Sequence, residues 1–455
     1  KFPSPTKGGN FHPMTYQEIL KKYWGYDSFR GIQEDIINSI GKGNDTLGLM
    51  PTGGGKSITF QVPALAQEGL CIVITPLIAL MKDQVRNLRE RGIKALAVYS
   101  GMTREEIVVA LENCIFGDYK FLYISPERLN TEIFQTKLKR MKVCMITVDE
   151  SHCISQWGYD FRPAYLNIAD IRKLLPDVPV LALTATATPE VVKDIQERLA
   201  FKEGSQVFRM SFERKNLAYI VRHTESKQEE ILHILNKVQG SAIVYTRNRK
   251  RTREIAEMLV TNNITATFYH AGLANEAKDQ RQKSWLNGES RVMVATNAFG
   301  MGIDKPDVRF VIHYDMPKSL EGYYQETGRA GRDGGEGLCI AFYSNKDMQK
   351  LRKFMQGKPV SEKDVSDELL KETEAYAESS VCRRKSLLHY FGEAYLEENC
   401  GNCDNCLNPK KKVEAQDSLC AVIEAIIAVK ENFKSDYIID LILGKETSEV
   451  LAHRH

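Results

Sequence analysis

A glycine-rich stretch near the start of the chain carries residues that can hold a nucleoside triphosphate. It reads MPTGGGKS, residues 50–57, and follows an apolar run. Small residues let consecutive backbone N–H groups wrap phosphate oxygens, Lys56 can reach the β and γ phosphates, and the Ser57 hydroxyl can bind Mg²⁺. Met50 stands where the strict pattern has a glycine, so the stretch alone could also be a surface turn. The predicted contacts are Thr52, Gly53, Gly54, Gly55, Lys56 and Ser57.

Two adjacent carboxylates, Asp149 and Glu150, follow the apolar run VCMITV. Such a run predicts a buried strand, and α/β proteins bind ligands at the carboxyl ends of parallel strands. Asp149 can hold Mg²⁺, and Glu150 can polarise an attacking water. An isolated Asp-Glu pair after a strand is usually a solvated turn. Behind a phosphate loop in the same domain, the pair is predicted to be catalytic.

Two arginines three residues apart, Arg329 and Arg332, lie among glycines in QETGRAGRDG. Hydrolysis of ATP builds negative charge on the γ phosphate, which an arginine commonly neutralises. Taken alone, the stretch is equally compatible with a basic surface turn. The glycine-rich loop ATNAFGMGIDKP brings Asp304 just behind another predicted strand. Both stretches could meet a nucleotide across a cleft between domains.

Four cysteines near the end of the chain have the spacing of a metal site. Cys400, Cys403 and Cys406 form C-x2-C-x2-C, and Cys382 is the nearest upstream candidate for a fourth ligand. Four thiolates are the ligand set of structural Zn²⁺, so we predict zinc in preference to a disulfide pair. His389 is a spare candidate that we expect to pack instead. The other six cysteines are expected mostly in the core.

Aromatic side chains crowd into the loop that follows Glu150. Trp157 and Phe161 could stack on bases, at roughly 1 to 3 kcal/mol per base, and Arg162 could pair with phosphate. Alternatively, these aromatic side chains could pack in an interface between domains. A second basic stretch, RNRKRTR at 247–253, fits a solvated helix face or a phosphate contact.

The elements that must position these residues follow from apolar periodicity. Short β-rich runs alternate with helical stretches over 45–205 and again over 210–345, which predicts two parallel sheets with crossover helices. Beyond 346 the pattern is helical and charged, and after a polar linker two short helices follow, the second capped by Ser435. The fold class is therefore α/β. The predicted domains are 1–206, 207–345, 346–408 (helical, zinc-binding) and 409–455.

Bulk composition limits the classes of protein that remain. A chain of 455 residues with 43% hydrophobic residues can bury several cores. With 62 Lys+Arg against 59 Asp+Glu, the net charge of +3 excludes nucleic-acid binding through bulk charge alone. The sequence has neither a run long enough to cross a membrane nor a signal peptide, so we expect an intracellular protein without a membrane partner.

The ordered motifs FRGIQ, MPTGGGKS, TPLIALMKDQV, VDESHCISQWGYDFRP, LTATAT, VATNAFGMGIDKP and YYQETGRAGRDG resemble the RecQ family of DNA helicases, of superfamily 2 and DExH type. The resemblance, to a bacterial-type catalytic core, covers nearly the whole chain. It implies two tandem RecA-like domains, ATP with Mg²⁺, and 3′ to 5′ translocation on single-stranded DNA with duplex unwinding. It further implies a role in recombination and repair, and an incomplete winged-helix domain at 409–455.

Residue by residue, the resemblance adds to both predicted sites. The family's adenine motif matches Tyr26, Arg30 and Gln33, and its other nucleotide contacts match Gly302, Asp304 and Gln325. The residues that it implies for binding DNA and for coupling DNA binding to ATP hydrolysis are His152, Trp157, Phe161, Arg162, Thr184 and Thr186. It implies single-stranded and forked DNA as partners and a monomer, located in the bacterial cytoplasm with the nucleoid or in a eukaryotic nucleus.

Two other functions stay open at this point. An RNA helicase or remodeller would use the same two-domain frame, but the DEAD-box group would show Asp-Glu-Ala-Asp where this chain has DESH. A non-catalytic nucleic-acid binding module would not need Lys56, Glu150 and Arg329.

Overall fold

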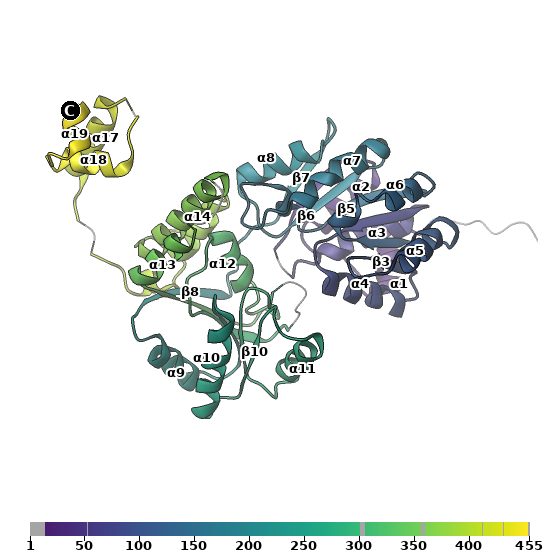
Figure 1. Ribbon diagram of the computed structural model, residues 1–455, viewed down its shortest axis with the longest axis horizontal. Helices are drawn as coiled ribbons and strands as arrows, with labels where there is room; N and C mark the ends of the chain where they lie inside the picture. The colour runs from purple at the N-terminus through teal and green to yellow at the C-terminus, as the bar shows by residue number, and fades with distance from the viewer. Residues whose placement is uncertain are drawn as a thin grey trace, which may run out of the picture. The chain divides into compact units, whose positions relative to one another are not determined.

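The computed structural model describes residues 14–51, 53–300, 305–355, 360–411, 413–430 and 432–453. These form two compact units, one up to Leu407 and one from Asn408 onward. The first unit contains two parallel sheets and a helical segment, which confirms the predicted α/β class (Figure 1). No helix in the described ranges is long and apolar enough to cross a bilayer.

The first sheet has seven parallel strands in the order β3-β4-β2-β5-β6-β1-β7. Its strands are β1 (Thr46–Leu49), β2 (Leu70–Ile74), β3 (Ala95–Val98), β4 (Phe121–Ile124), β5 (Val143–Val148), β6 (Val180–Thr184) and β7 (Gln206–Arg209). Its helices are α1 (Tyr16–Trp24), α2 (Gln33–Gly41), α3 (Lys56–Ala66), α4 (Ile78–Glu90), α5 (Arg104–Phe116), α6 (Glu132–Leu138), α7 (Ile168–Leu174) and α8 (Pro189–Arg198), with short 3₁₀ segments η1 (Pro126–Arg128), η2 (Ser151–Ile154) and η3 (Pro163–Asn167).

Helices cover both faces of this sheet, as the continuous apolar strands predict. In β2, Ile72 and Ile74 pack in one apolar cluster, while Cys71 and Val73 pack in another on the opposite face. All four side chains are at most 1% exposed. The carboxyl ends of the strands therefore form a rigid edge on which loops can hold side chains.

The second sheet has six parallel strands in the order β10-β11-β9-β12-β13-β8. Its strands are β8 (Leu217–His223), β9 (Ser241–Tyr245), β10 (Ala266–Tyr269), β11 (Val292–Ala295), β12 (Val308–His313) and β13 (Gly337–Tyr343). Its helices are α9 (Lys227–Lys237), α10 (Arg249–Thr261), α11 (Asn275–Leu286) and α12 (Leu320–Thr327).

A helical segment follows the second sheet and packs against it. It consists of α13 (Asn345–Met355), α14 (Val360–Glu378), α15 (Arg383–Tyr390) and α16 (Asp404–Leu407). Arg384 of α15 is 6% exposed and donates to the carbonyl oxygen of Leu217 in β8 at 3.0 Å. Arg383 donates to both carboxylate oxygens of Asp404, at 3.0 and 3.1 Å. These buried arginines fix the segment to the edge strand β8.

The second unit is a small group of three helices, α17 (Gln416–Ala428), α18 (Ser435–Ile442) and α19 (Ser448–His453). Val429, Tyr437, Ile438 and Val450 form its buried cluster. Ser435 is the first residue of α18, and Lys434 takes the capping position without a side-chain bond, so the predicted serine cap is wrong.

A buried charge network joins the amino ends of the neighbouring strands β6, β1 and β7 and offers a test of the packing of the first sheet. Asp45 is 2% exposed and accepts hydrogen bonds from the N–H groups of Val180, at 2.9 Å, and Lys202, at 2.7 Å. It also pairs with Arg172. Removing one member of a buried pair leaves an uncompensated charge, which costs roughly 3 to 5 kcal/mol.

We expect Asp45→Ala to lower the opening free energy of β1 and β6 amides by roughly 3 to 5 kcal/mol, measured by hydrogen exchange. Asp170→Ala removes an exposed partner of Lys173 at 2.9 Å and is the matched control. It should change the same free energy by less than about 1 kcal/mol. Equal effects of both substitutions would contradict a structural role for the buried pair.

Candidate functional site

The glycine-rich loop runs from the end of β1 to the first residue of α3. Gly53 and Gly55 have φ angles of 84° and 75°, where other residues are strained. A Cβ atom on Gly55 would lie 2.4 Å from Nε2 of Gln33, and one on Gly54 would meet backbone at 2.9 Å. The loop therefore has the bare backbone that a phosphate cradle needs. Thr52 lies outside the described residues.

Of the three residues predicted to contact adenine, Gln33 touches this loop. The Tyr26 side chain is 45% exposed, and the Arg30 guanidinium carbon lies 5.4 Å from its ring centre. Nε2 of Gln33 donates to the carbonyl oxygens of Gly54 and Gly55, each at 3.2 Å. In this structure the Gln33 amide, for which a base contact is predicted, therefore braces the loop, while the Tyr26 ring is open for stacking.

Glu150 faces the lysine of the phosphate loop. Nζ of Lys56 lies 3.7 Å from Oε1 of Glu150, with side chains 17% and 10% exposed. Glu150 has a φ of 48°, a left-handed conformation that costs about 1 to 2 kcal/mol and turns the chain sharply at the end of β5. Its Oε2 atom is buried and lies 3.4 Å from Nδ1 of His152, but it accepts no well-aligned hydrogen bond from the described part of the chain. An unsatisfied carboxylate oxygen beside a phosphate loop fits a residue that orients water.

Asp149 lies next to this pair, and its Oδ1 atom accepts the N–H of Glu150 at 3.0 Å. Burial first, and then the Glu150 carboxylate, raises the pKa of Asp149 to about 6, while Lys56 opposes the rise. A divalent cation favours the ionised form of a nearby carboxylate. Asp149 and the Ser57 hydroxyl offer the oxygen ligands that Mg²⁺ prefers.

His152 and Thr184, both predicted as coupling residues, are in direct contact. His152 is 1% exposed, and its Nδ1 lies 2.8 Å from Oγ1 of Thr184 at the end of β6. Burial lowers the pKa of His152 to about 3, so the imidazole is neutral. The Thr184 hydroxyl donates to the carbonyl oxygen of Thr186 at 3.1 Å, so it accepts from His152, which places the imidazole hydrogen on Nδ1. The Tyr159 ring stacks on this imidazole with centroids 5.0 Å apart.

The aromatic loop presents one of its predicted DNA contacts to solvent and holds the others partly buried. Trp157 is 58% exposed, whereas Phe161 and Arg162 are half-buried. Nε and Nη2 of Arg162 both donate to Oδ2 of Asp160, at 3.2 and 3.0 Å. Trp157 is thus available for stacking, while Arg162 must leave Asp160 to reach a phosphate.

The base of this loop is fixed to the segment that carries Asp149 and Glu150. The N–H of Arg162 donates to the carbonyl oxygen of Cys153 at 2.8 Å. The Tyr165 side chain is fully buried, and its hydroxyl donates to the carbonyl oxygen of Asp149 at 2.9 Å. A displacement of the loop can therefore pass directly to the backbone that carries the carboxylates.

The predicted arginines of the second domain, Arg329 and Arg332, lie just after α12. Arg329 is 6% exposed and donates to the carbonyl oxygen of Gly300, and Gln325 is half-buried on α12. A Cβ atom on Gly53 would lie 4.0 Å from Cγ of Arg332, so that arginine lies near the phosphate loop. Gly302 and Asp304, predicted to contact nucleotide, are outside the described residues.

Sequence reasoning missed a buried pair that holds α12 in place. Nε2 of His313, at the end of β12, lies 2.7 Å from Oε2 of Glu326, one helical turn before Arg329. The His313 ring stacks on Tyr245 with centroids 5.4 Å apart. A histidine at the end of a mostly apolar strand was the available signal. The pair fixes the helix that leads into the predicted arginine.

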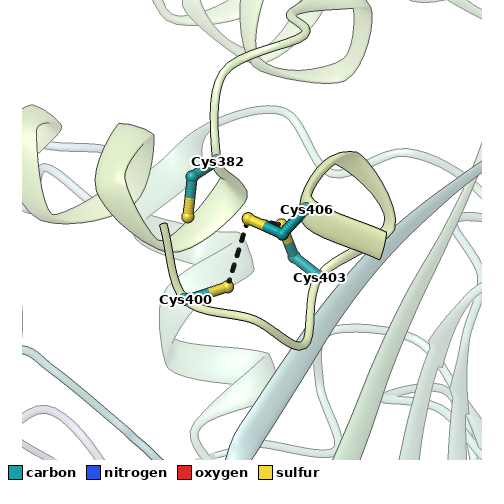
Figure 2. Close-up of side chains that lie close together, drawn as sticks. All are labelled: Cys382, Cys400, Cys403 and Cys406. Atoms are coloured by element: carbon teal, nitrogen blue, oxygen red, sulfur yellow. Dashed lines mark hydrogen bonds between the residues drawn. The ribbon is translucent and has the colours of Figure 1, made fainter. Parts of the chain in front are cut away.

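The four predicted zinc ligands come together between α14 and α16 (Figure 2). Their sulfur atoms all lie within 4.8 Å of one another, and Sγ of Cys406 is 3.3 Å from that of Cys403 and 3.9 Å from that of Cys400. A tetrahedral Zn²⁺ with bonds of about 2.3 Å places its sulfur ligands about 3.8 Å apart. Cys382 completes the set, and the donors fit structural zinc.

The structure also tests the predictions for His389 and for the six cysteines outside the zinc cluster. His389 is exposed on α15, so the prediction that it packs is wrong, although it does lie outside the four-sulfur cluster. Of the six cysteines outside the cluster, four are buried as predicted, Cys144 is partly buried and Cys420 is exposed; the four are Cys71, Cys114, Cys153 and Cys339.

The basic stretch 247–253 opens α10 with two kinds of contact. Arg253 pairs with Glu257 at 2.6 Å and Lys250 with Glu254 at 3.6 Å, both one helical turn away. Arg251 instead reaches Asp315 at the end of β12, at 3.2 Å. Most of the stretch therefore behaves as a solvated helix face.

Two parallel sheets lie in tandem, the first with a phosphate loop and paired carboxylates and the second with two arginines just after α12. This arrangement defines the helicase class of nucleotide-dependent motors. Models described as DEAD/DEAH box helicase, helicase conserved C-terminal domain and RecQ zinc-binding match residues 30–195, 226–334 and 345–407. The chain is 40% identical over 454 residues to an ATP-dependent DNA helicase RecQ of Haemophilus influenzae, covering 99% of this chain and 73% of the relative. This chain belongs to the RecQ family, and its four-cysteine cluster is a structural zinc site.

Two further comparisons bear on fold and substrate. A putative ATP-dependent RNA helicase of Acanthamoeba polyphaga mimivirus is 39% identical over 450 residues, covering 95% of this chain and 81% of the relative. A structure of Mycobacterium smegmatis helicase Lhr bound to ssDNA and AMP-PNP has a TM-score of 0.59 at 18% identity, covering 83% of this chain and 56% of that one. The second comparison supports the RecA-like fold alone.

The raised pKa of Asp149 predicts how Mg²⁺ binding depends on pH. Protonation competes with the cation, so the Mg²⁺ concentration that half-saturates ATPase activity should rise up to about tenfold per pH unit as the pH falls below about 6. In Asp149→Asn, nucleotide-dependent Mg²⁺ binding measured by calorimetry should be weak and nearly independent of pH. A half-saturating concentration that stays constant from pH 8 to 5.5 would contradict this assignment.

Proposed function

We propose that this chain is an ATP-dependent DNA helicase of RecQ type, which couples ATP hydrolysis to 3′ to 5′ translocation on single-stranded DNA and to unwinding. The observation that carries the proposal is the contact of Lys56 with Glu150 at 3.7 Å, beside Asp149, at the carboxyl edge of the first sheet. A non-catalytic binding module has no use for a buried lysine and carboxylates around a bare glycine loop.

The proposed roles divide among four domains. Residues 1–206 bind ATP, 207–345 supply Arg329 and Arg332, 346–408 hold zinc, and 409–455 begin a winged-helix domain. Ser57 and Asp149 would hold Mg²⁺, which supplies charge neutralisation on the phosphates when it is bound. Glu150 orients the water, and Tyr26 stacks on the adenine. Gly302, Asp304 and Gln325 complete the nucleotide contacts.

Single-stranded and forked DNA are the proposed substrates, bound by a monomer. Loop amides and exposed aromatics contact the strand without reading its sequence. The proposed setting is recombination and repair, in the cytoplasm with the nucleoid for a bacterial chain and in the nucleus for a eukaryotic one.

The aromatic loop is proposed to report DNA binding to the ATP site. Trp157 and Phe161 stack on bases, and Arg162 exchanges Asp160 for a phosphate. The loop is bonded at its base to Cys153 and, through Tyr165, to Asp149, so its movement can shift the carboxylates. His152 and the threonines Thr184 and Thr186 connect that segment to the end of β6.

ATPase rates with single-stranded DNA, with RNA and without nucleic acid test the function. We expect DNA to stimulate turnover and Lys56→Ala to abolish it while DNA binding persists, because Lys56 lies in the phosphate loop. RNA-selective stimulation would favour the RNA helicase alternative, which the name of the mimivirus relative raises. Equal rates under all three conditions would refute a helicase.

A second prediction tests the coupling role of the exposed tryptophan. Trp157→Ala removes one stacking side chain and should weaken single-stranded DNA binding by a factor of about 5 to 100, with basal ATPase much less affected. Phe116→Ala removes another exposed aromatic, 71% exposed on α5, and is the matched control. It should leave DNA stimulation unchanged. Parallel loss of basal and stimulated activity in Trp157→Ala would instead indicate a packing role.

A further inference from the structure

A second cluster of metal-ligating side chains lies at the base of the aromatic loop. One ring nitrogen of His152, the sulfur of Cys153 and a carboxylate oxygen of Asp160 all lie within 4.8 Å of one another. Apart from the zinc cluster, it is the one such group of three or more that the described residues contain. None of the roles argued above for ATP, Mg²⁺ or zinc uses Cys153 or Asp160 as a metal ligand.

The separations in this cluster are close to those of a tetrahedral metal site. Sγ of Cys153 is 3.8 Å from Nε2 of His152 and 3.7 Å from Oδ2 of Asp160. Zn²⁺ bonds of about 2.3 Å to sulfur and about 2.0 Å to nitrogen or oxygen place such atoms about 3.5 Å apart. Shifts of a few tenths of an ångström therefore bring these two ligands into range, and water can take the fourth position.

A hydrogen bond to Thr184 orients the imidazole of His152 for metal binding. Nδ1 carries the hydrogen and donates to Thr184, so the lone pair is on Nε2, which faces Cys153. A metal-ligating histidine typically donates its other N–H in this manner, which fixes both the tautomer and the ring orientation. Thr184 thus supplies the outer hydrogen bond that such a ligand needs.

Access also suits a cation, which must displace Arg162 from Oδ2 of Asp160 to bind there. His152 and Cys153 are at most 1% exposed, whereas the Asp160 side chain is 33% exposed, so an ion meets the carboxylate first. Thiolate and imidazole ligands favour Zn²⁺ and softer divalent ions over Mg²⁺, which prefers oxygen. The thiol proton passes to water as the metal–sulfur bond forms.

We propose that His152, Cys153 and Asp160 form a second, lower-occupancy site for Zn²⁺-like divalent cations, and that filling it restrains the aromatic loop and suppresses DNA stimulation. The metal would join the segment after Glu150 to a loop residue two positions from Arg162, which now pairs with Asp160. The proposal that this site binds a metal rests on geometry alone. The proposal that bound metal suppresses DNA stimulation also rests on the proposed helicase function.

Metal binding is measured first, without reference to activity. The full chain, with its four-cysteine site loaded with zinc, is equilibrated with Cd²⁺ in excess Mg²⁺, and bound metal and thiolate absorbance are recorded. We expect wild type to bind one more Cd²⁺ than Cys153→Ser and to bind it at least about tenfold more tightly than Asp160→Asn. Cys420→Ser, which changes an exposed cysteine outside the cluster, should match wild type.

Equal Cd²⁺ binding by wild type, Cys153→Ser and Asp160→Asn would overturn the site. The half-exposed position of Asp160 keeps the comparison informative if Cys153→Ser folds poorly. In the ATPase assay, the half-inhibitory Cd²⁺ concentration for DNA-stimulated turnover should rise at least about tenfold in both variants. Equal inhibition of wild type and both variants by Cd²⁺ would overturn the proposal that this site regulates DNA stimulation. Absence of DNA stimulation before metal is added would instead refute the helicase function and leave the binding result standing.

Discussion

The contact between Lys56 and Glu150 is the interaction on which the rest of the site depends. The two residues are 94 positions apart and meet because β1 and β5 flank β6 in one parallel sheet, which brings both carboxyl ends to one edge. The register Leu49 to Thr184 sets the height of β1 against β6. A shift of one residue would move the lysine by about 3.3 Å, enough to break the pair.

The left-handed turn at Glu150 has a second consequence. It directs the chain from β5 into a short 3₁₀ segment whose His152 returns to Thr184, and then into the aromatic loop. The carboxylates Asp149 and Glu150, proposed to act at the nucleotide, and the solvent-exposed Trp157 thereby share one continuous piece of backbone. Local strain of about 1 to 2 kcal/mol at one residue is a small cost for that connection.

The zinc segment is fixed to the second sheet and also meets the end of β7 in the first, where Nη1 of Arg209 donates to the carbonyl oxygen of Phe391 at 3.2 Å. Its arginines are fixed to β8 and to Asp404, whose carboxylate also accepts the N–H of Val221 at 3.1 Å. Metal binding in such a segment is coupled to folding, so zinc stabilises the support of the second sheet. The helix α12, which precedes Arg329 and Arg332, is held separately by the contact of Glu326 with His313.

The sequence by itself determined the chemistry, because the phosphate loop, the paired carboxylates and the C-x2-C-x2-C cluster each lie within a few residues and have few other uses. It also determined the α/β class, because apolar runs fix strand order along the chain. Only the tertiary structure decided which distant residues meet. Gln33 contacts the phosphate loop, His313 contacts Glu326, His389 is exposed, and Asp160 lies close to His152 and Cys153. Contacts between separate elements depend on sheet order and side-chain direction, and the periodicity of the sequence does not encode either.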